Sequence, residues 1–213
     1  MNKPLKKLAA CLLLAAGLTT NTFAQWEYVG TPDLSAGIAN FTSLAFSPSG
    51  EPYVAYRDEG ISAMAKASVK KFDGSNWVYV GNPGFSEYTA NDISFGFSPS
   101  GEPYVAYQDK ANSYKATVMK FDGTAWVNVG AVGFSEGIAN YTSLAFSPSG
   151  EPYVAYQDNG NSQYATVMKF DGTSWVNVGT PGFSAGDAIY TSLAFSPSGE
   201  PYVAYGDNGN SNK

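Results

Sequence analysis

The sequence predicts an all-β protein, a β-propeller built from four-stranded blades that repeat about every 49 residues. Two markers recur with one period of 51, 49 and 49 residues. One is the tryptophan series Trp26, Trp77, Trp126 and Trp175, and the other is the string SPSGEPYVAY, which begins at Ser47, Ser98, Ser147 and Ser196. Each period also holds four short runs of strand-forming residues. Four strands in a repeat of this length are typical of a propeller blade.

The third unit illustrates the four expected strands. They are Tyr141–Phe146, Tyr153–Tyr156, Ala165–Phe170 and Trp175–Val178. All are rich in β-branched and aromatic residues and are bounded by Gly, Pro, Asn, Asp or Ser. They are apolar runs rather than strict alternations, which indicates sheets that are covered on both faces.

The connections between these strands carry turn signals. Ser147–Gly150 has proline second and glycine fourth, as in a type I turn, and Pro152 stands where a strand begins. Asp171–Ser174 predicts a second tight connection. The first unit has two extra residues between its second and third strands, so this connection should be a longer loop.

The units predict three complete blades with partial ones at each end of the chain. The blades span about 41–81, 92–130 and 141–179, with an incomplete one at 190–213 and a lone outer strand at 25–30. Because a third strand would begin at Lys213, we expect a fragment of a larger propeller; the alternative is a four-bladed ring with one deficient blade. An open blade edge would also allow self-association.

Residues 1–24 predict a secretory signal peptide. Lys3, Lys6 and Lys7 precede an apolar run, and Ala24 ends a small-x-small cleavage pattern. The alternative is a lipoprotein signal in which Cys11 would be lipidated. Either signal predicts a secreted, extracellular or cell-surface protein, or a periplasmic one.

Cleavage after Ala24 leaves a propeller repeat domain over 25–213 and removes the sole cysteine. It also takes away three lysines and no acidic residue, which changes the formal net charge from −6 to −9. Such a charge argues against nucleic acid as a partner. No later segment is apolar for long enough to be a membrane-spanning helix, so no membrane insertion is expected.

Several motifs resemble known propeller repeats. Gly150–Ala155, Asp158–Asn159, Val167–Gly172 and Val178–Gly179 are similar to the NHL repeat, although Tyr156 and Thr166 depart from its pattern. The period is closer to that of kelch repeats, whose double glycine is missing. The units are also similar to those of secreted bacterial propellers with FDGxxW repeats. These resemblances imply binding and scaffolding more often than catalysis.

The residue types exclude much catalytic chemistry. The chain has no histidine, and after cleavage no cysteine, so histidine-based triads and the usual zinc sites are excluded. Sialidase chemistry needs several arginines, whereas Arg57 is the only one here. Repeated carboxylates leave glycoside chemistry open, but a solvated turn position explains them more simply: Glu51, Glu102, Glu151 and Glu200.

No cofactor is predicted, with calcium as the one alternative. Asp158, Asn161, Asp207 and Asn210 lie in two DNGNS segments that offer oxygen ligands around a glycine bend. Each segment contains a single carboxylate, and ordinary turn chemistry explains it as well.

The long connections should share one face of the propeller, opposite the tight turns. Residues there that differ between units are the candidates for ligand recognition: Arg57, Glu59, Tyr88, Lys110, Gln163, Tyr164 and Asp187. The recurring Phe85, Phe134 and Phe183 should anchor these loops, and the tryptophans should pack between blades.

The expected function is that of a secreted, non-enzymatic module that binds a protein or a glycan through the long-loop face. One alternative is a glycan-active hydrolase or lyase that uses carboxylates. Another is a structural repeat of a larger surface protein.

Overall fold

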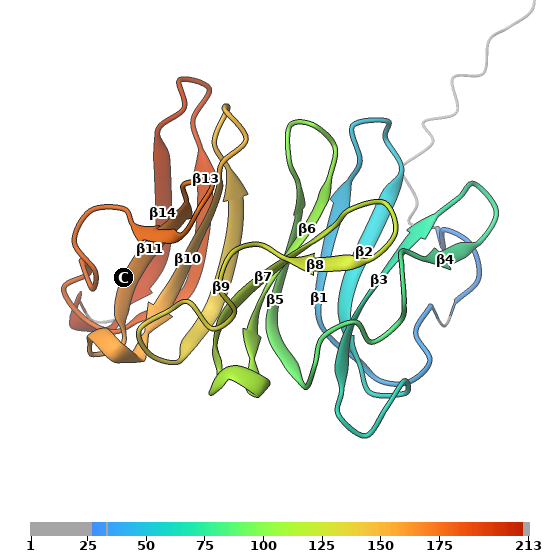
Figure 1. Cartoon of the computed structure of the whole chain (residues 1–213), viewed down its shortest axis with the longest axis horizontal. Helices are drawn as coiled ribbons and strands as arrows, with labels where there is room; N and C mark the ends of the chain where they lie inside the picture. The colour runs from blue at the N-terminus through green and yellow to red at the C-terminus, as the bar shows by residue number, and fades with distance from the viewer. Residues whose placement is uncertain (1–26, 33, 211–213) are drawn as a thin grey trace, which may run out of the picture.

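The protein has an all-β fold made of four propeller blades in a row. The computed structural model describes residues 27–32 and 34–210. Three blades are four-stranded antiparallel sheets whose strands lie in chain order, and the fourth is a two-stranded sheet. The first and fourth blades lie at opposite ends of the row (Figure 1). The predicted fold class is therefore confirmed.

The strand bounds repeat from blade to blade. The first blade consists of β1 (Ala39–Phe46), β2 (Pro52–Asp58), β3 (Lys66–Phe72) and β4 (Trp77–Tyr79). The second consists of β5 (Ala90–Phe97), β6 (Pro103–Asp109), β7 (Lys115–Phe121) and β8 (Trp126–Asn128). The third consists of β9 (Ala139–Phe146), β10 (Pro152–Asp158), β11 (Tyr164–Phe170) and β12 (Trp175–Asn177). The fourth contains β13 (Ala188–Phe195) and β14 (Pro201–Asp207).

The two kinds of connection lie at opposite ends of the strands. The turns between first and second strands form one edge, at the top of Figure 1. The connections from second to third strands lie at the other edge, and three of the blades carry a short 3₁₀ helix there: η1 (Lys110–Asn112), η2 (Asn159–Asn161) and η3 (Asn208–Asn210). We call these edges the tight-turn face and the long-loop face.

Hydrogen bonds form the predicted tight turns. In the third blade the Gly150 amide donates to the Ser147 carbonyl at 2.9 Å. Gly150 has a φ of +90°, a conformation that glycine adopts without the steric cost of a side chain. Pro152 is the first residue of β10, where its missing N–H costs no internal ladder bond. The repeated SPSGEP string is therefore the corner between the first two strands.

The first strands of neighbouring blades pack on one another, β1 on β5, β5 on β9 and β9 on β13. A serine links each pair, for example where the Leu144 amide of β9 donates to Ser94 Oγ of β5 at 2.9 Å. Burial follows the position in the row. Every residue of β10 is buried, whereas most of β14, in the end blade, is partly or fully exposed. The apolar runs of the inner blades thus reflect two covered faces.

Trp126 and Trp175 pack between blades, as predicted, whereas Trp26 lies outside the described residues. Trp175 is only 8% exposed and stacks on Phe134, with ring centroids 4.1 Å apart. Its indole Nε1 donates to the carbonyl of Val129, in the preceding blade, at 2.8 Å. Phe85 stacks on Trp126 in the same way at 4.4 Å. Two of the predicted loop anchors, Phe85 and Phe134, therefore hold the interblade connection against the next blade.

The chain before the first blade differs from the expectation. Residues 27–30 contain no strand, and positions 25 and 26 lie outside the described residues. The reason is that no described strand pairs with residues 27–30, whereas each fourth strand needs a third strand beside it. Val29 still accepts the Trp77 indole N–H at 2.7 Å, as Val129 does for Trp175. The described part of the chain holds no helix of the length and apolarity that a membrane crossing needs.

Candidate binding site on the inner strands

Every first strand contains a β-bulge at the same place. In β1 the pairing with β2 shifts between Asn40 and Ser43, and equivalent shifts occur in β5, β9 and β13. The bulge residues adopt a left-handed backbone, with φ of 50°, 46°, 53° and 56° at Phe41, Asp92, Tyr141 and Tyr190. Such a conformation costs a bulky residue roughly 1–3 kcal/mol and is concentrated at functional sites.

The bulge residues are held across neighbouring blades. The Tyr141 amide donates to Asp92 Oδ2 at 3.0 Å, and the Thr142 hydroxyl donates to the Asp92 carbonyl. The rings of Tyr141 and Tyr190 are 4.9 Å apart at an interplanar angle of 56°. Tyr190 is 71% exposed and Phe41 40%, so aromatic surface is presented to solvent.

Arg57 joins this row from β2. Its guanidinium carbon lies 4.8 Å from the centroid of the Phe41 ring. Its Nη1 donates to Asn91 Oδ1 at 2.6 Å, and its Nη2 pairs with Glu59 Oε1 at 2.9 Å. Burial raises the pKa of Asp92, while the Tyr141 amide and the Arg57 charge act in the opposite direction. We call Phe41, Arg57, Asp92, Tyr141 and Tyr190 the bulge cluster.

A chain of side-chain amides continues from Arg57 along the row of blades. Asn91 donates to Gln108 at 2.9 Å, Gln108 to Asn140 at 2.7 Å, and Asn140 to Gln157 at 2.8 Å. Gln108 and Gln157 are buried. A polar network of this kind holds side chains in fixed positions, although Arg57 Nε is buried without a hydrogen-bond partner among the described residues.

The structure brings some predicted ligand-binding residues together and leaves others apart. Arg57 and Glu59 form an ion pair, and Lys110 Nζ lies 5.1 Å from the centre of the Tyr88 ring. The remaining three, Gln163, Tyr164 and Asp187, have no described contact with these pairs. Gln163 lies just before β11, Tyr164 begins that strand, and Asp187 lies just before β13. The expectation that all seven lie in loops is wrong for two of them, because β2 and β11 are longer than predicted and include Arg57 and Tyr164.

Backbone hydrogen bonds explain the positions of Gln163 and Asp187. The Gln163 amide donates to the Asp158 carbonyl at 2.9 Å, and its own carbonyl accepts from Ala188 at 3.0 Å. The Asp187 carbonyl accepts from the Asn208 amide at 3.1 Å. Gln163 and Asp187 therefore stabilise the backbone of their own connections through main-chain hydrogen bonds.

The carboxylate of Asp158, considered as a calcium ligand, accepts hydrogen bonds from the residues around it. Asp158 is 1% exposed and accepts hydrogen bonds from the Gly160 amide, Asn161 Nδ2 and Thr166 Oγ1 at 3.0, 2.8 and 3.2 Å. Asp207 accepts from the Gly209 amide at 2.8 Å, and the side chain of Asn210 lies outside the described part. Within the described residues no three acidic, histidine or cysteine side chains group as a metal site. The turn alone accounts for Asp158.

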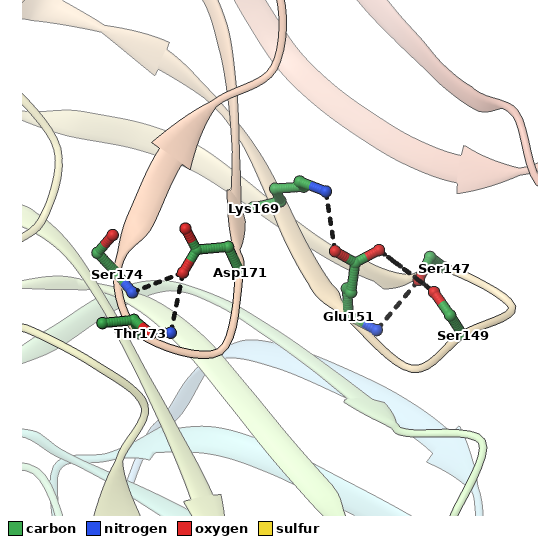
Figure 2. Close-up of polar contacts among 7 residues, drawn as sticks. All are labelled: Ser147, Ser149, Glu151, Lys169, Asp171, Thr173 and Ser174. Atoms are coloured by element: carbon green, nitrogen blue, oxygen red, sulfur yellow. Dashed lines mark hydrogen bonds and ion pairs between the residues drawn. The ribbon is translucent and has the colours of Figure 1, made fainter.

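The repeated glutamates stabilise the tight-turn face. Figure 2 shows Glu151 between the turn serines and Lys169 of β11. Its Oε1 lies 2.8 Å from Lys169 Nζ, and its amide donates to Ser147 Oγ at 3.0 Å. The Lys169 hydrogen bond lowers the pKa of Glu151. In the adjacent turn Asp171 Oδ1 accepts the amides of Thr173 and Ser174, both at 2.9 Å. These contacts fit the turn interpretation of the carboxylates.

Sequence reasoning missed the bulge cluster apart from Arg57, although a signal for it was present. The inner strands read ANFTSLAF, ANDISFGF, ANYTSLAF and AIYTSLAF, and their third position varies as Phe, Asp, Tyr and Tyr. This variation is the same signal that marks recognition candidates in the loops. A bulge inside a strand is set by long-range pairing, so its residues read as ordinary strand positions.

No protein-family model matches this chain, and no curated protein sequence does either. Several solved structures are similar in fold. A protein of unknown function from Dyadobacter fermentans has a TM-score of 0.54 at 16% identity, over 79% of this chain and 57% of that one. An ulvan lyase, described as a new family of polysaccharide lyase, has a TM-score of 0.56 at 11% identity, over 81% and 48%. An α-L-arabinanase from Penicillium chrysogenum, complexed with arabinobiose, has a TM-score of 0.54 at 13% identity, over 78% and 57%.

These similarities support the propeller fold and do not place the chain among NHL or kelch repeats. The chain spans about half the length of these three structures.

Proposed function

We propose that this protein is a secreted, non-enzymatic module that binds glycans through the bulge cluster. The observation that carries the proposal is the strained bulge, which recurs in all four inner strands while its side chain varies among Phe, Asp and Tyr. Strain in a bulky residue persists where the surrounding structure enforces it, and it is concentrated at binding sites. A scaffold role alone would favour one repeated residue here, as it does at the tight turns.

The chemistry of the cluster suits a sugar. The exposed ring of Tyr190 offers a flat apolar surface to the C–H face of a sugar, beside the tilted ring of Tyr141. Asp92 supplies an acceptor for hydroxyl groups and Arg57 a donor. Two of the fold neighbours, at 11% and 13% identity, are a polysaccharide lyase and an arabinanase, which adds to this support.

Binding to a glycan array, followed by titration calorimetry on the ligands found, tests the proposal. Tyr190→Ala should weaken affinity at least tenfold, since stacking on an aromatic ring is lost. Tyr202→Ala is the matched control, because Tyr202 is also an exposed tyrosine, at 61%, but lies in β14 outside the cluster. Equal effects of the two substitutions, or none from Tyr190→Ala, would refute the assignment.

A second candidate is a glycan-active hydrolase or lyase, which the environment of Asp92 favours. Burial raises the pKa of this carboxyl, as is usual for a general acid. Incubating the full chain with a panel of neutral and uronic-acid polysaccharides tests this function. Turnover by the full chain that Asp92→Asn abolishes would favour the enzyme over the binding module.

The proposal also includes export of the protein. We infer export from the basic and apolar pattern of residues 1–24. Expression of the full chain with N-terminal sequencing of the exported product tests it, and a mature chain that begins at Gln25 is the expected result. A product acylated at Cys11 would support the lipoprotein alternative instead.

A further inference from the structure

The two end blades each present to solvent one half of the contact that joins neighbouring blades. Inside the row, the first strand of each blade lies against the first and second strands of the blade before it, as β9 lies against β5 and β6. The fourth blade contains a first and a second strand, β13 and β14, and the first blade contains β1. Both halves of one further interblade contact are therefore present, at opposite ends of the row (Figure 1).

The half on the first blade is an exposed apolar surface. Leu44 and Phe46 of β1 are 61% and 62% exposed and point to the same side of the strand. The residues equivalent to Leu44 are Phe95, Leu144 and Leu193, and each is less than 10% exposed because it packs against the preceding blade. We call Leu44 and Phe46 the leading face. It presents to solvent the side chains that the other three blades cover.

The half on the fourth blade fits this surface. Inside the row, Tyr153 of β10 makes an edge-to-face contact with Phe195 of the next blade, with ring centroids 4.9 Å apart. Tyr202 holds the same position in β14 and is 61% exposed. Ala155 is fully buried beneath the next blade, whereas its equivalent Ala204 is exposed. The fourth blade therefore presents the surface against which a phenylalanine of a following blade packs.

The polar part of the contact is also repeated. The Leu193 amide donates to Ser143 Oγ of the preceding blade at 2.9 Å, and two further pairs of blades have the same hydrogen bond. The equivalent groups at the ends of the row are the Leu44 amide and the hydroxyl of Ser192, which is exposed. We call Ser192, Tyr202 and Ala204 the trailing face. The leading and trailing faces thus match in apolar shape and in hydrogen bonding.

We propose that copies of this chain associate head to tail, with the trailing face of one copy packed on the leading face of the next. Tyr202 of one copy then meets Phe46 of the next copy, as Tyr153 meets Phe195 inside the chain. A second copy is the occupant because its end blade carries the surface that all three internal contacts use. Since the two faces differ, the contact is heterologous and generates a ring where the rotation closes and an open row where it does not.

Sedimentation velocity of the full chain as exported, over a range of concentrations, measures the association. Phe46→Glu and Tyr202→Glu should each weaken it at least tenfold, because each places a carboxylate in an apolar contact. Both residues are largely exposed, so circular dichroism should show an unchanged fold. Val132→Glu is the matched control: Val132 is 42% exposed but lies in the connection before the third blade, and its substitution should leave the association unchanged.

An equal mixture of the two weakened variants identifies the head-to-tail geometry. Phe46→Glu keeps its trailing face and Tyr202→Glu keeps its leading face. Each variant alone should be monomeric, and the mixture should form a dimer and nothing larger, because only one intact contact can form.

Four results would overturn the proposal. The first is a wild-type chain that stays monomeric at every soluble concentration. The second is a mixture of the two variants that stays monomeric while the wild type associates. The third is association that Phe46→Glu removes and Tyr202→Glu does not, which would mean that two leading faces pair with each other. The fourth is association that survives in both variants, which would assign it to the open edge of β14. The inference does not depend on the glycan site, since none of these variants changes a residue of the bulge cluster.

Discussion

Trp175 connects the second and third blades, so its removal should destabilise the protein more than removal of Trp77. The two tryptophans occupy the same position of the repeat, and each donates its indole N–H to a valine carbonyl of the preceding segment. Their surroundings differ. Trp175 is buried and stacks on Phe134, whereas Trp77 is half-buried and has Leu34 at the position of that phenylalanine.

The expected magnitudes follow from these contacts. Truncating a buried tryptophan to alanine costs about 3–5 kcal/mol, so Trp175→Ala should lower the free energy of unfolding by about 4 kcal/mol. Trp77 has less area to lose and no aromatic stack, and we expect about 2 kcal/mol for Trp77→Ala. For a domain of this size a loss of 4 kcal/mol lowers the melting temperature by roughly 10 °C.

Urea unfolding followed by circular dichroism measures both losses. Phe134→Leu serves as the control, since it reproduces the first-blade residue and should cost about 1 kcal/mol through the loss of stacking alone. Equal losses for Trp77→Ala and Trp175→Ala would refute the reasoning, because they would mean that stacking and burial between blades contribute nothing beyond the shared hydrogen bond.

Three other predictions test the tight turns and the interblade packing. Glu151→Gln should destabilise the protein by about 0.2–1 kcal/mol at neutral pH. Because the folded-state pKa of Glu151 lies below its ordinary 4.5, the difference in stability between wild type and variant is present above pH 4.5. It should be lost in urea titrations as the pH falls below 4.5 and through the lowered pKa. Gly130→Ala should lower the melting temperature more than Gly179→Ala: their φ values are +72° and +74°, but only Gly130 would bring a Cβ to 2.7 Å from a phenylalanine ring atom. Asp158→Asn should lower the free energy of unfolding by about 2 kcal/mol, because three donors lose a carboxylate acceptor. Thermal unfolding measures this loss. A loss no larger than that of the exposed Asp171→Asn would contradict the role of Asp158 as the buried acceptor of its connection.

Much of the architecture could be predicted because short sequence motifs, repeated in each unit, specify it. The proline and glycine of Ser147–Gly150 specify a corner without reference to distant residues. The apolar run Pro152–Tyr156 of β10 indicates a sheet with two covered faces. The period of the tryptophans predicts their interblade role, since a large aromatic residue that recurs once per blade meets the same neighbour each time.

The bulge cluster could not be predicted in the same way. No residue near Phe41 or Tyr190 in the sequence indicates a left-handed backbone. The shift in pairing depends on how each inner strand pairs with the second strand of its blade. The space between the second and third blades depends on tertiary structure for the same reason. Asn128 and Glu151 are 23 positions apart in the sequence, and only the packing of two blades makes them line one space.

The sequence by itself therefore determined the blade, its corners and its period, since these depend on residues within a few positions of one another. Only the tertiary structure decided which side chains gather at the bulges of the inner strands. The bulges and the amide chain from Arg57 to Gln157 depend on contacts between residues that lie 17 to 50 positions apart, and the sequence around each residue does not specify these contacts.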